Sequence, residues 1–360
     1  MRLFSWKAII LLILMFCLFL SAQNSKQTEP AKVYFTKDIS AAGVENIFQY
    51  INENVNGKVA IKVHFGEDGN KTFLNPEMVK GLAKQLDATL VETNVLYVGK
   101  RRYTESHIKL AKKHGFDFAP IDILDSEGEK VIPVNTSHYQ QIKVGSHMDN
   151  YGSFLIYSHF KGHGMAGFGG AIKNVAMGLA AISGKMAMHA SSIPTYSPSK
   201  CISCNLCVPE CPGNAITIDP LVIDADKCIG CGTCIGICPQ RCFGVPWSST
   251  DRSVFMERLC EYAKGITDNY NMVYINVLAN ITPACDCAGW PQKPFMDDIG
   301  IVASNDIVAV EQASHDLVDK AHNCDNTFLK EVKVNGKRQI EYSAELGMGN
   351  RNYELIDIDK

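Results

Sequence analysis

Short apolar runs typical of buried strands alternate along most of the chain with segments whose apolar residues recur at helical spacing. The apolar runs predict strands over residues 32–35, 58–65, 89–98, 153–160, 272–278 and 299–303. The helical spacing predicts helices over residues 41–55, 76–86, 105–114, 170–182, 254–263 and 306–322. Such alternation is typical of a mainly parallel sheet with helices on its faces. The predicted fold class is therefore α/β.

The alternation stops in the middle of the chain and resumes later. The interrupting segment follows a loop rich in Ser and Pro, and it contains nine of the 14 cysteines. The simplest organisation is one α/β domain in two parts, residues 31–195 and 246–360, with a small α+β module of the ferredoxin type inserted over residues 196–245.

The cysteines of the inserted module repeat the spacing C-x2-C-x2-C-x3-C-P twice. This spacing is that of bacterial ferredoxins with two [4Fe-4S] clusters, in which the fourth cysteine of each run ligates the other cluster. We therefore predict two clusters. One is bound by Cys201, Cys204, Cys207 and Cys238, and the other by Cys228, Cys231, Cys234 and Cys211.

Zinc sites and disulfides are the alternatives for these cysteines. Zinc sites usually pair two C-x2-C units across a longer loop, and a disulfide framework has no reason to repeat one spacing. Both patterns differ from the one found. The residues between the cysteines also fit clusters, since we expect Ile202, Ile229 and Ile235 to keep water away from them.

The first 22 residues form a targeting segment. Arg2 and Lys7 precede an apolar run over residues 8–20, which small residues follow at Ser21 and Ala22. This order is typical of a secretory signal peptide, and the run is shorter than the roughly 18–20 residues of a membrane span. We expect an exported, periplasmic or otherwise extracytoplasmic protein. The alternative is an uncleaved anchor in the inner membrane.

Residues 161–174 combine a glycine-rich loop with a basic helix start. The G-x-G-x-x-G pattern that ends at Gly167 is found in dinucleotide sites, but the acidic residue expected about 20 positions later is absent. No Asp or Glu occurs over residues 150–209, which argues against a nicotinamide cofactor. We expect Gly167, Gly169, Gly170 and Lys173 to bind an anion at the start of the helix. The alternative is that the glycines permit close packing.

Two histidines beside this loop are candidate catalytic residues. His159 and His163 flank Lys161 at a spacing suited to line a pocket, as proton donors or metal ligands. Together with Lys173 they form the predicted catalytic set. Histidines within predicted helices, such as His107, are expected at the surface.

A second group of cysteines lies after the strand predicted over residues 272–278. Cys285 and Cys287 are separated by one acidic residue, Asp286. Two thiols in this arrangement can bind a metal, accept electrons or form disulfides. The alternative is that Cys285 and Cys287 only pack against their neighbours and have no chemical role.

Six stretches of the sequence resemble domain-of-unknown-function family 362. They are KVAIKVHFGE (58–67), LVETNVLYVGKRR (90–102), SHFKGHGMAGFGGAIKNVAMG (158–178), the repeated cysteine run, CDC (285–287) and DIGIVASNDIVAVEQAS (298–314). The resemblance extends over most of residues 31–324. It implies the fold and an insert with two clusters, and it implies no substrate.

We expect an iron–sulfur oxidoreductase that passes single electrons to or from an anionic small molecule. The alternative is an electron carrier whose α/β domain docks a redox partner and does no chemistry. An enzyme predicts a polar pocket at the glycine loop near a cluster, whereas a carrier predicts a flat apolar face there. An electron-transfer partner protein is expected in both cases. The net charge of −3 argues against a nucleic-acid partner.

Overall fold

The computed structural model describes residues 29–189, 193–247, 249–290 and 292–360. The predicted signal peptide or anchor, residues 1–22, lies outside these ranges. Among the helices in these ranges, none combines the length and the apolar character needed to cross a membrane. Residues Ala31–Lys360 form one compact unit.

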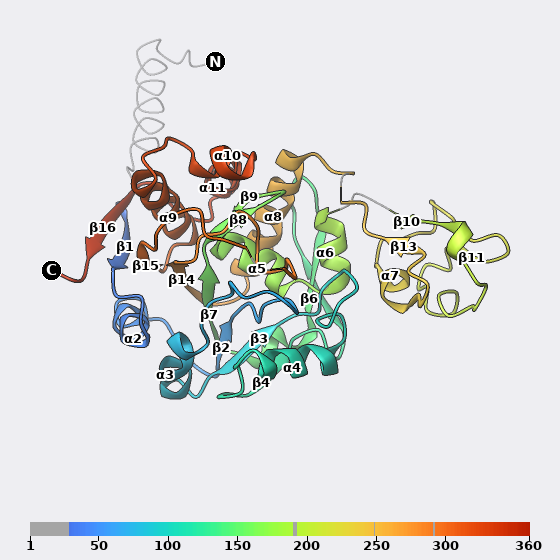
Figure 1. Ribbon diagram of the computed structural model, residues 1–360, viewed down its shortest axis with the longest axis horizontal. Coiled ribbons are helices and arrows are strands. Elements are labelled where there is room, and N and C mark those ends of the chain that lie inside the picture. The colour runs from blue at the N-terminus through green and yellow to red at the C-terminus, as the bar shows by residue number, and fades with distance from the viewer. Residues whose placement is uncertain (1–28, 190–192, 248, 291) are drawn as a thin grey trace, which may run out of the picture. The chain divides into compact units, whose positions relative to one another are not determined.

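An eight-stranded, mainly parallel sheet runs through the unit (Figure 1). Its order is β16 (Tyr353–Asp357), β1 (Ala31–Thr36), β15 (Gly300–Ser304), β14 (Met272–Leu278), β7 (Ser153–His159), β2 (Val59–Lys62), β3 (Thr89–Glu92) and β4 (Ile121–Ile123). The pairs from β14 to β4 are parallel, as is β1 with β16, and β15 is antiparallel to both of its neighbours. The predicted α/β fold class is confirmed.

Helices cover both faces of the sheet. Side chains alternate between the two faces along each strand, and apolar residues on both faces are buried in the cores beneath these helices. One apolar core lies under α2 (Ala41–Phe48), α3 (Glu77–Gln85) and α4 (Thr104–Lys113). The other lies under α5 (Ala171–Leu179), α8 (Arg252–Thr267), α9 (Ile307–Ala321) and α11 (Lys337–Glu345). On β2, for example, Ile61 belongs to the first core and Ala60 to the second.

Smaller elements lie outside the sheet. They are the hairpins β5–β6 (Glu129–Pro133 and Gln141–Gly145) and β8–β9 (Lys161–His163 and Gly167–Gly169), the 3-10 helix η1 (Ser146–Asn150), and the helices α6 (Ile182–His189) and α10 (Thr327–Val332). The hairpin β8–β9 lies directly before α5, so it contains the glycine loop.

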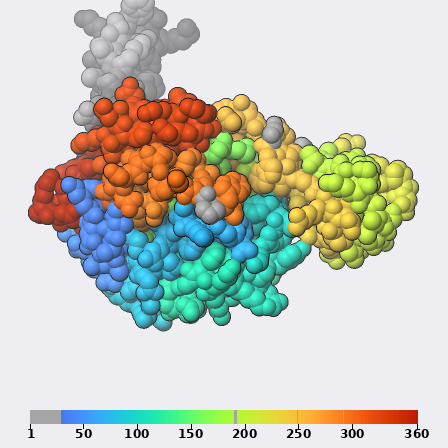
Figure 2. Space-filling model, in the orientation of Figure 1, coloured from blue at the N-terminus to red at the C-terminus, as the bar shows by residue number. Residues whose placement is uncertain are grey.

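The cysteine-rich module, predicted over residues 196–245, contains short elements only, which lie between residues 195 and 244. They are the strand pairs β10–β13 (Thr195–Tyr196 and Phe243–Gly244) and β11–β12 (Ile216–Thr217 and Val222–Ile223), the helix α7 (Thr233–Ile237) and the 3-10 helix η2 (Pro198–Lys200). Figure 2 shows this yellow-green segment gathered in a lobe. The strands β7 and β14, which precede and follow the module in the chain, are neighbours in the sheet.

Several elements end earlier than their apolar patterns predict. The strand expected over residues 58–65 ends at Lys62, and the one expected over 89–98 ends at Glu92. The residues that follow leave the sheet and carry polar side chains into the candidate site. The helix α9 begins after Asp306, whose carboxylate accepts hydrogen bonds from the N–H groups of Val308 and Ala309.

Candidate functional site

A cavity of about 400 Å³ lies where the carboxyl ends of four parallel strands meet. Each strand brings a residue to its wall: His64 follows β2, Glu92 ends β3, His159 ends β7, and Cys285 lies in the loop after β14. Ligands of open parallel sheets bind at this edge. The sheet therefore places the cavity where this type of fold forms its sites.

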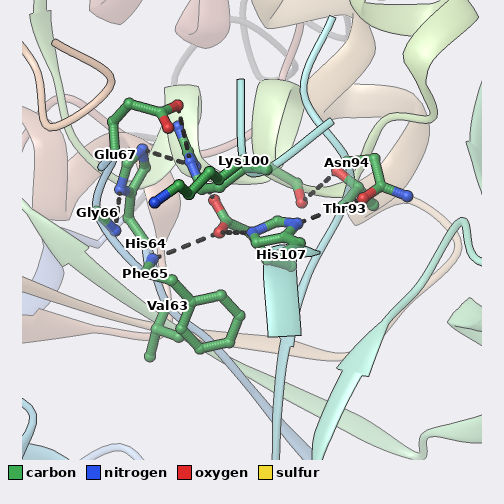
Figure 3. Close-up of polar contacts among 12 residues, drawn as sticks. Val63, His64, Phe65, Gly66, Glu67, Thr93, Asn94, Lys100 and His107 are labelled. Carbon is green, nitrogen blue, oxygen red and sulfur yellow. Dashed lines mark hydrogen bonds and ion pairs between the residues drawn. The ribbon is translucent and has the colours of Figure 1, made fainter. Parts of the chain in front are cut away.

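A network of buried charges centred on Glu92 supports the wall of the cavity. The Glu92 carboxylate accepts a hydrogen bond from Arg101 Nη1 at 3.0 Å and lies 3.0 Å from His107 Nε2. Arg101 also donates to Glu67 at 3.2 Å. Figure 3 shows Glu67 and His107 within this network. The expectation that His107 lies at the surface is wrong, because the buried face of α4 directs this ring toward Glu92.

The cations of this network keep Glu92 ionised. Burial alone would raise the pKa of Glu92, but Arg101 and Lys62 hold it well below its usual range. Burial lowers the pKa of Lys62 to about 8, against the attraction of Glu92. Burial also lowers the pKa of Lys185 to about 8, and this ammonium donates to Thr93 Oγ1 at 2.5 Å. Two lysines with weakened charges thus lie beside the cavity.

Basic side chains outnumber acidic ones in the lining. The basic ones are Lys62, Arg101, Lys161, Lys173 and Lys185, and the acidic one is Glu92. A second acid, Asp286, lies fully buried behind the lining with Oδ2 3.1 Å from Lys161 Nζ. The remaining excess of positive charge favours an anionic ligand.

Lys173 projects from the first turn of α5 toward the cavity. Within the described residues its ammonium has neither a hydrogen bond nor an ion pair, and its side chain is partly buried. Burial, together with the nearby charge of Lys161, lowers the pKa of Lys173 to about 7, while Asp286 opposes the shift. Lys173 is therefore an unpartnered amine with a proton that is readily lost near neutral pH.

The start of α5 is occupied by a carboxylate of the protein. Glu311 Oε1 accepts from the N–H of Ala171 at 2.5 Å and from Asn276 Nδ2 at 2.9 Å. A Cβ at Gly170 would collide with this carboxylate, so this glycine permits its approach. The N–H group expected to be free for a ligand therefore has a protein acceptor. Positive charge at the cavity comes from lysines.

The other glycines of the loop differ in their surroundings. Gly167 has φ +79°, and a Cβ there would collide with the backbone of Gly336, so packing accounts for it. Gly169 lines the cavity, and a Cβ there would lie 3.1 Å from the Lys173 side chain. Of the three, Gly169 and Gly170 border the cavity.

The two candidate histidines have different environments. The His159 ring is buried, with Nδ1 2.9 Å from Asp286 Oδ2 and Nε2 2.8 Å from the carbonyl oxygen of Ala279. Both of its nitrogens are therefore engaged. His163 is partly buried, and its Nδ1 accepts from the N–H groups of Met165 and Ala166. Burial and the charge of Lys173 hold the pKa of His163 well below its usual range.

Cys285 and Cys287 lie in the cavity wall beside His163 and are joined by a disulfide. Their sulfurs and one ring nitrogen of His163 lie within 4.8 Å of one another. Within the described residues, this is the group of three that comes close enough to hold one metal ion. Of the possibilities that the pattern C-x-C left open, the structure shows a disulfide, and His163 lies beside it in the cavity wall.

Eight of the module's nine cysteines come together in two sets. The first set, Cys201, Cys204, Cys207 and Cys238, lines one small hollow. The second set, Cys211, Cys228, Cys231 and Cys234, lines another. These are the two groupings that the repeated spacing predicts, with the fourth cysteine of each run in the other set.

The backbone near these cysteines is bent so that N–H groups reach sulfur. The N–H groups of Ala215 and Cys242 each donate to the sulfur of the cysteine four positions earlier, at 3.3 Å. Ile235 is 2% exposed, as expected, but Ile202 and Ile229 are 60% and 61% exposed. These two isoleucines nevertheless line the hollows of the first and the second set, respectively, so their role in excluding water stays a prediction.

The second cysteine set lies against the α/β domain. Arg102 Nη2 donates to the carbonyl oxygen of Gly232 at 3.2 Å, and Tyr103 donates to that of Gly236 at 2.5 Å. Leu96 packs in the same apolar cluster as Cys234 and also lines the cavity. One residue therefore borders both the module and the cavity.

A sequence profile described as "Domain of unknown function (DUF362)" matches residues 59–316. The chain belongs to the DUF362 family. The resemblance noted in the sequence is thereby confirmed. The DUF362 match includes every cavity-lining residue and all eight cysteines of the two sets. The chain is thus a cysteine-rich DUF362 protein with a candidate metal site in its cavity.

Other comparisons give distant similarities. No curated protein matches the chain. The lactate racemase apoprotein from Thermoanaerobacterium thermosaccharolyticum is 12% identical at a TM-score of 0.35, over 68% of this chain and 50% of its own. A protein from Thermotoga maritima is 9% identical at a TM-score of 0.38, over 85% of this chain and 58% of its own. The DUF362 chain therefore spans about half the length of these structures.

Sequence reasoning did not single out several residues of the DUF362 cavity. Lys62, Glu92 and Arg101 occur in strand ends and in the loop after β3, where they look like ordinary polar residues. A charged residue inside an apolar strand, such as Lys62 in VAIKV, is the signal that could have indicated them, because buried charges need partners.

Proposed function

We propose that this protein binds two [4Fe-4S] clusters and passes single electrons to or from an anionic substrate in the cavity. The observation that carries the proposal is the grouping of eight cysteines in two interleaved sets of four, each around its own hollow. Thiolates in such sets are the ligands of [4Fe-4S] clusters. When bound, these clusters supply and accept electrons one at a time.

The order of the cysteines supports a cluster over a single ion. Zinc sites usually pair two C-x2-C units across a longer loop. Each set here takes three cysteines from one run and its fourth from the other run, as in two-cluster ferredoxins. Backbone N–H groups that point at Cys211 and Cys238 also suit a cluster, whose potential depends on such hydrogen bonds.

The cavity supports an enzyme over a simple electron carrier. A carrier predicts a flat apolar face at the glycine loop, whereas this loop borders a cavity of about 400 Å³ with five basic side chains in its lining. Lys173 is the residue we propose to contact the substrate, since its ammonium has no partner in the described part of the chain. With a pKa of about 7, it can pair with an anion or transfer a proton at neutral pH.

His163 is the second residue that we propose to act on a substrate. It lies in the cavity wall, and its Nδ1 is held by two backbone donors, so Nε2 carries the proton of the neutral ring. His159 is a positioning residue, because Asp286 and a carbonyl oxygen engage its ring. The two predicted catalytic histidines thus receive different roles.

The second cysteine set is the one that we propose to exchange electrons with the cavity, because Leu96 borders both. The first set is then the entry point for a partner protein. Cys204 of that set is exposed, and Ile202 and Leu206 beside it are 60% and 48% exposed. Exposed apolar residues next to a cluster ligand suit the transient docking of an electron-transfer protein.

Metal analysis after anaerobic reconstitution tests the proposal. Protein incubated with iron, sulfide and an equal amount of zinc should retain about eight irons and eight sulfides per chain, as two cubes require. Zinc in both cysteine sets, with no sulfide, would overturn the proposal.

A further inference from the structure

The loop between β14 and β15 turns two sulfurs toward the cavity and one carboxylate away from it. Cys285 and Cys287 line the cavity, whereas Asp286 between them is fully buried. Asp286 is held by His159 at 2.9 Å and by Lys161 at 3.1 Å. Because its central residue is anchored from behind, the loop presents both sulfurs from a fixed backbone.

His163 faces the two sulfurs with a defined tautomer. Its Nδ1 accepts hydrogen bonds from the N–H groups of Met165 at 3.3 Å and Ala166 at 3.1 Å. An acceptor nitrogen carries no proton, so the neutral ring has its proton on Nε2. The N–H donor of His163 is therefore Nε2, and one nitrogen of this ring lies within 4.8 Å of both sulfurs.

This tautomer distinguishes redox chemistry from metal binding. A metal ion needs the unprotonated nitrogen of the ring, and backbone donors already occupy it. The two sulfurs alone would be a poor zinc site, since structural zinc takes four protein ligands and catalytic zinc three. A thiolate next to an N–H donor is, in contrast, the arrangement of reactive cysteines.

We propose that Cys285 and Cys287 form a reversible dithiol–disulfide centre in the cavity, with His163 as the hydrogen-bond donor to its thiolate. Reduction breaks the S–S bond, consumes two electrons and two protons, and leaves two thiols. The reductant is a dithiol or two one-electron donors. That the module's clusters are those donors rests on the function proposed above, whereas the dithiol chemistry itself does not.

The two sulfurs are not equivalent. Cys287 is partly exposed and Cys285 is 6% exposed. Access decides which sulfur reacts with a molecule from outside. Cys287 is thus the sulfur that attacks or is attacked first, and Cys285 is the one that closes the disulfide.

Thiol trapping on the full-length protein tests the centre. Anaerobic protein is reduced with dithiothreitol or oxidised with diamide, alkylated with iodoacetamide at pH 7 and digested for peptide mass spectrometry. The peptide that contains both cysteines should carry two alkyl groups after reduction and none after oxidation, through repeated cycles. Cys287→Ser should abolish the cycle, and the matched control Cys324→Ser, outside the cavity, should leave it intact.

The rate of alkylation tests the role of His163. His163→Leu, which removes the donor, should slow the alkylation of Cys287 about tenfold or more, because less thiolate is present at pH 7. His163→Gln, which keeps an N–H donor, should recover part of the rate. Equal rates in wild type and His163→Leu would overturn the assignment of His163.

Further outcomes separate the dithiol centre from the iron–sulfur function. A Cys285–Cys287 disulfide that dithiothreitol does not reduce, or a dithiol that diamide does not oxidise, would overturn the proposed centre. This holds even if iron and sulfide are present in the same sample. Reversible cycling in a sample that retains no iron or sulfide after anaerobic reconstitution would keep the centre and contradict the iron–sulfur function. The reduced protein could also bind one zinc per chain and lose it in both Cys287→Ser and His163→Leu. That result would show that the two cysteines and His163 form a metal site and would overturn the dithiol centre.

Discussion

In the α/β domain an eight-stranded sheet separates two large apolar cores, whereas the cysteine-rich module has strands of two residues and one small core that includes three cysteines. The domain can be stabilised by burial of its own side chains. The module has little apolar surface to bury, and its cysteines converge on two hollows. A bound cofactor is expected to contribute most of its folding free energy, as in other small metal-binding modules.

The two regions also differ in how they form a site. The module takes its ligands from one continuous segment, residues 201–238. The cavity takes its residues from the ends of strands and the loops after them, spread over residues 62–290. Two of its lysines, Lys62 and Lys161, pair with acids that lie later in the chain, Glu92 and Asp286. Loss of the cofactor should therefore affect the module, and loss of a buried charge should affect the domain.

Of the changes considered, removal of iron is expected to have the largest effect, and this effect should separate the module from the domain. Chelation with an oxidant should unfold the module and leave the sheet folded, because the module depends on its cofactor. In hydrogen exchange, amides over residues 201–242 should exchange at the rate of an unfolded chain, while those of β14 and β7 stay protected. Protection that persists in the iron-free module would contradict the contrast.

Arg101→Met should have the next largest effect, this time on the domain. The substitution leaves Glu67 buried without its Arg101 partner and Glu92 with Lys62 alone among its described lysine and arginine partners. Removal of one partner of a buried ion pair typically costs about 3–5 kcal/mol of unfolding free energy. Urea denaturation of the sheet measures this loss. Lys100→Met is the matched control, because the exposed pair of Lys100 with Asp68 should contribute at most about 1 kcal/mol. Equal losses in both variants would show that the buried network is not stabilising.

Lys173→Ala should weaken the binding of succinate, the probe for an anionic ligand, without changing the iron content. A hydrogen bond to a charged group contributes about 1.5–3 kcal/mol, so the affinity should fall about tenfold or more. Isothermal titration calorimetry measures it, and Lys173→Arg should recover part of the loss. Lys84→Ala, on the exposed face of α3, is the control. An unchanged affinity in Lys173→Ala would place the ligand elsewhere.

The smallest of the predicted effects is the dependence of succinate affinity on pH. The pKa of Lys173 is about 7 in the free protein, so its charge is present below pH 7 and is lost as the pH rises above it. The charges of Lys62 and Lys185, with pKa values of about 8, are lost next. Succinate affinity should fall several-fold between pH 6.5 and 8.5, and the fall should be smaller in Lys173→Ala. A steeper fall in the variant would contradict the assignment.

The sequence was informative where chemistry and spacing coincide. The two cysteine sets follow from local spacing, and the parallel sheet follows from the alternation of strands and helices. The environment of Lys173 did not follow. Lys173 has no ion pair with Glu311, 138 positions later, because this carboxylate accepts a hydrogen bond from the N–H of Ala171 at the start of α5. Glu92 and Arg101 were overlooked for the same reason, since their pairing appears only when the loop after β3 folds back on the strand end.

Electron paramagnetic resonance of the dithionite-reduced protein tests the central claim most directly. Two reduced [4Fe-4S] clusters should give about two unpaired spins per chain, with broadening from their interaction. Cys238→Ala should remove the cluster of the first set, although Cys238 follows the cysteines of the second in the chain, and leave about one spin. Cys242→Ala removes a buried cysteine that lines the hollow of the first set but is not one of its four predicted ligands, and it should keep both clusters. A protein without this signal that contains zinc, or a Cys238→Ala variant that loses the cluster of Cys228, Cys231 and Cys234, would contradict the account.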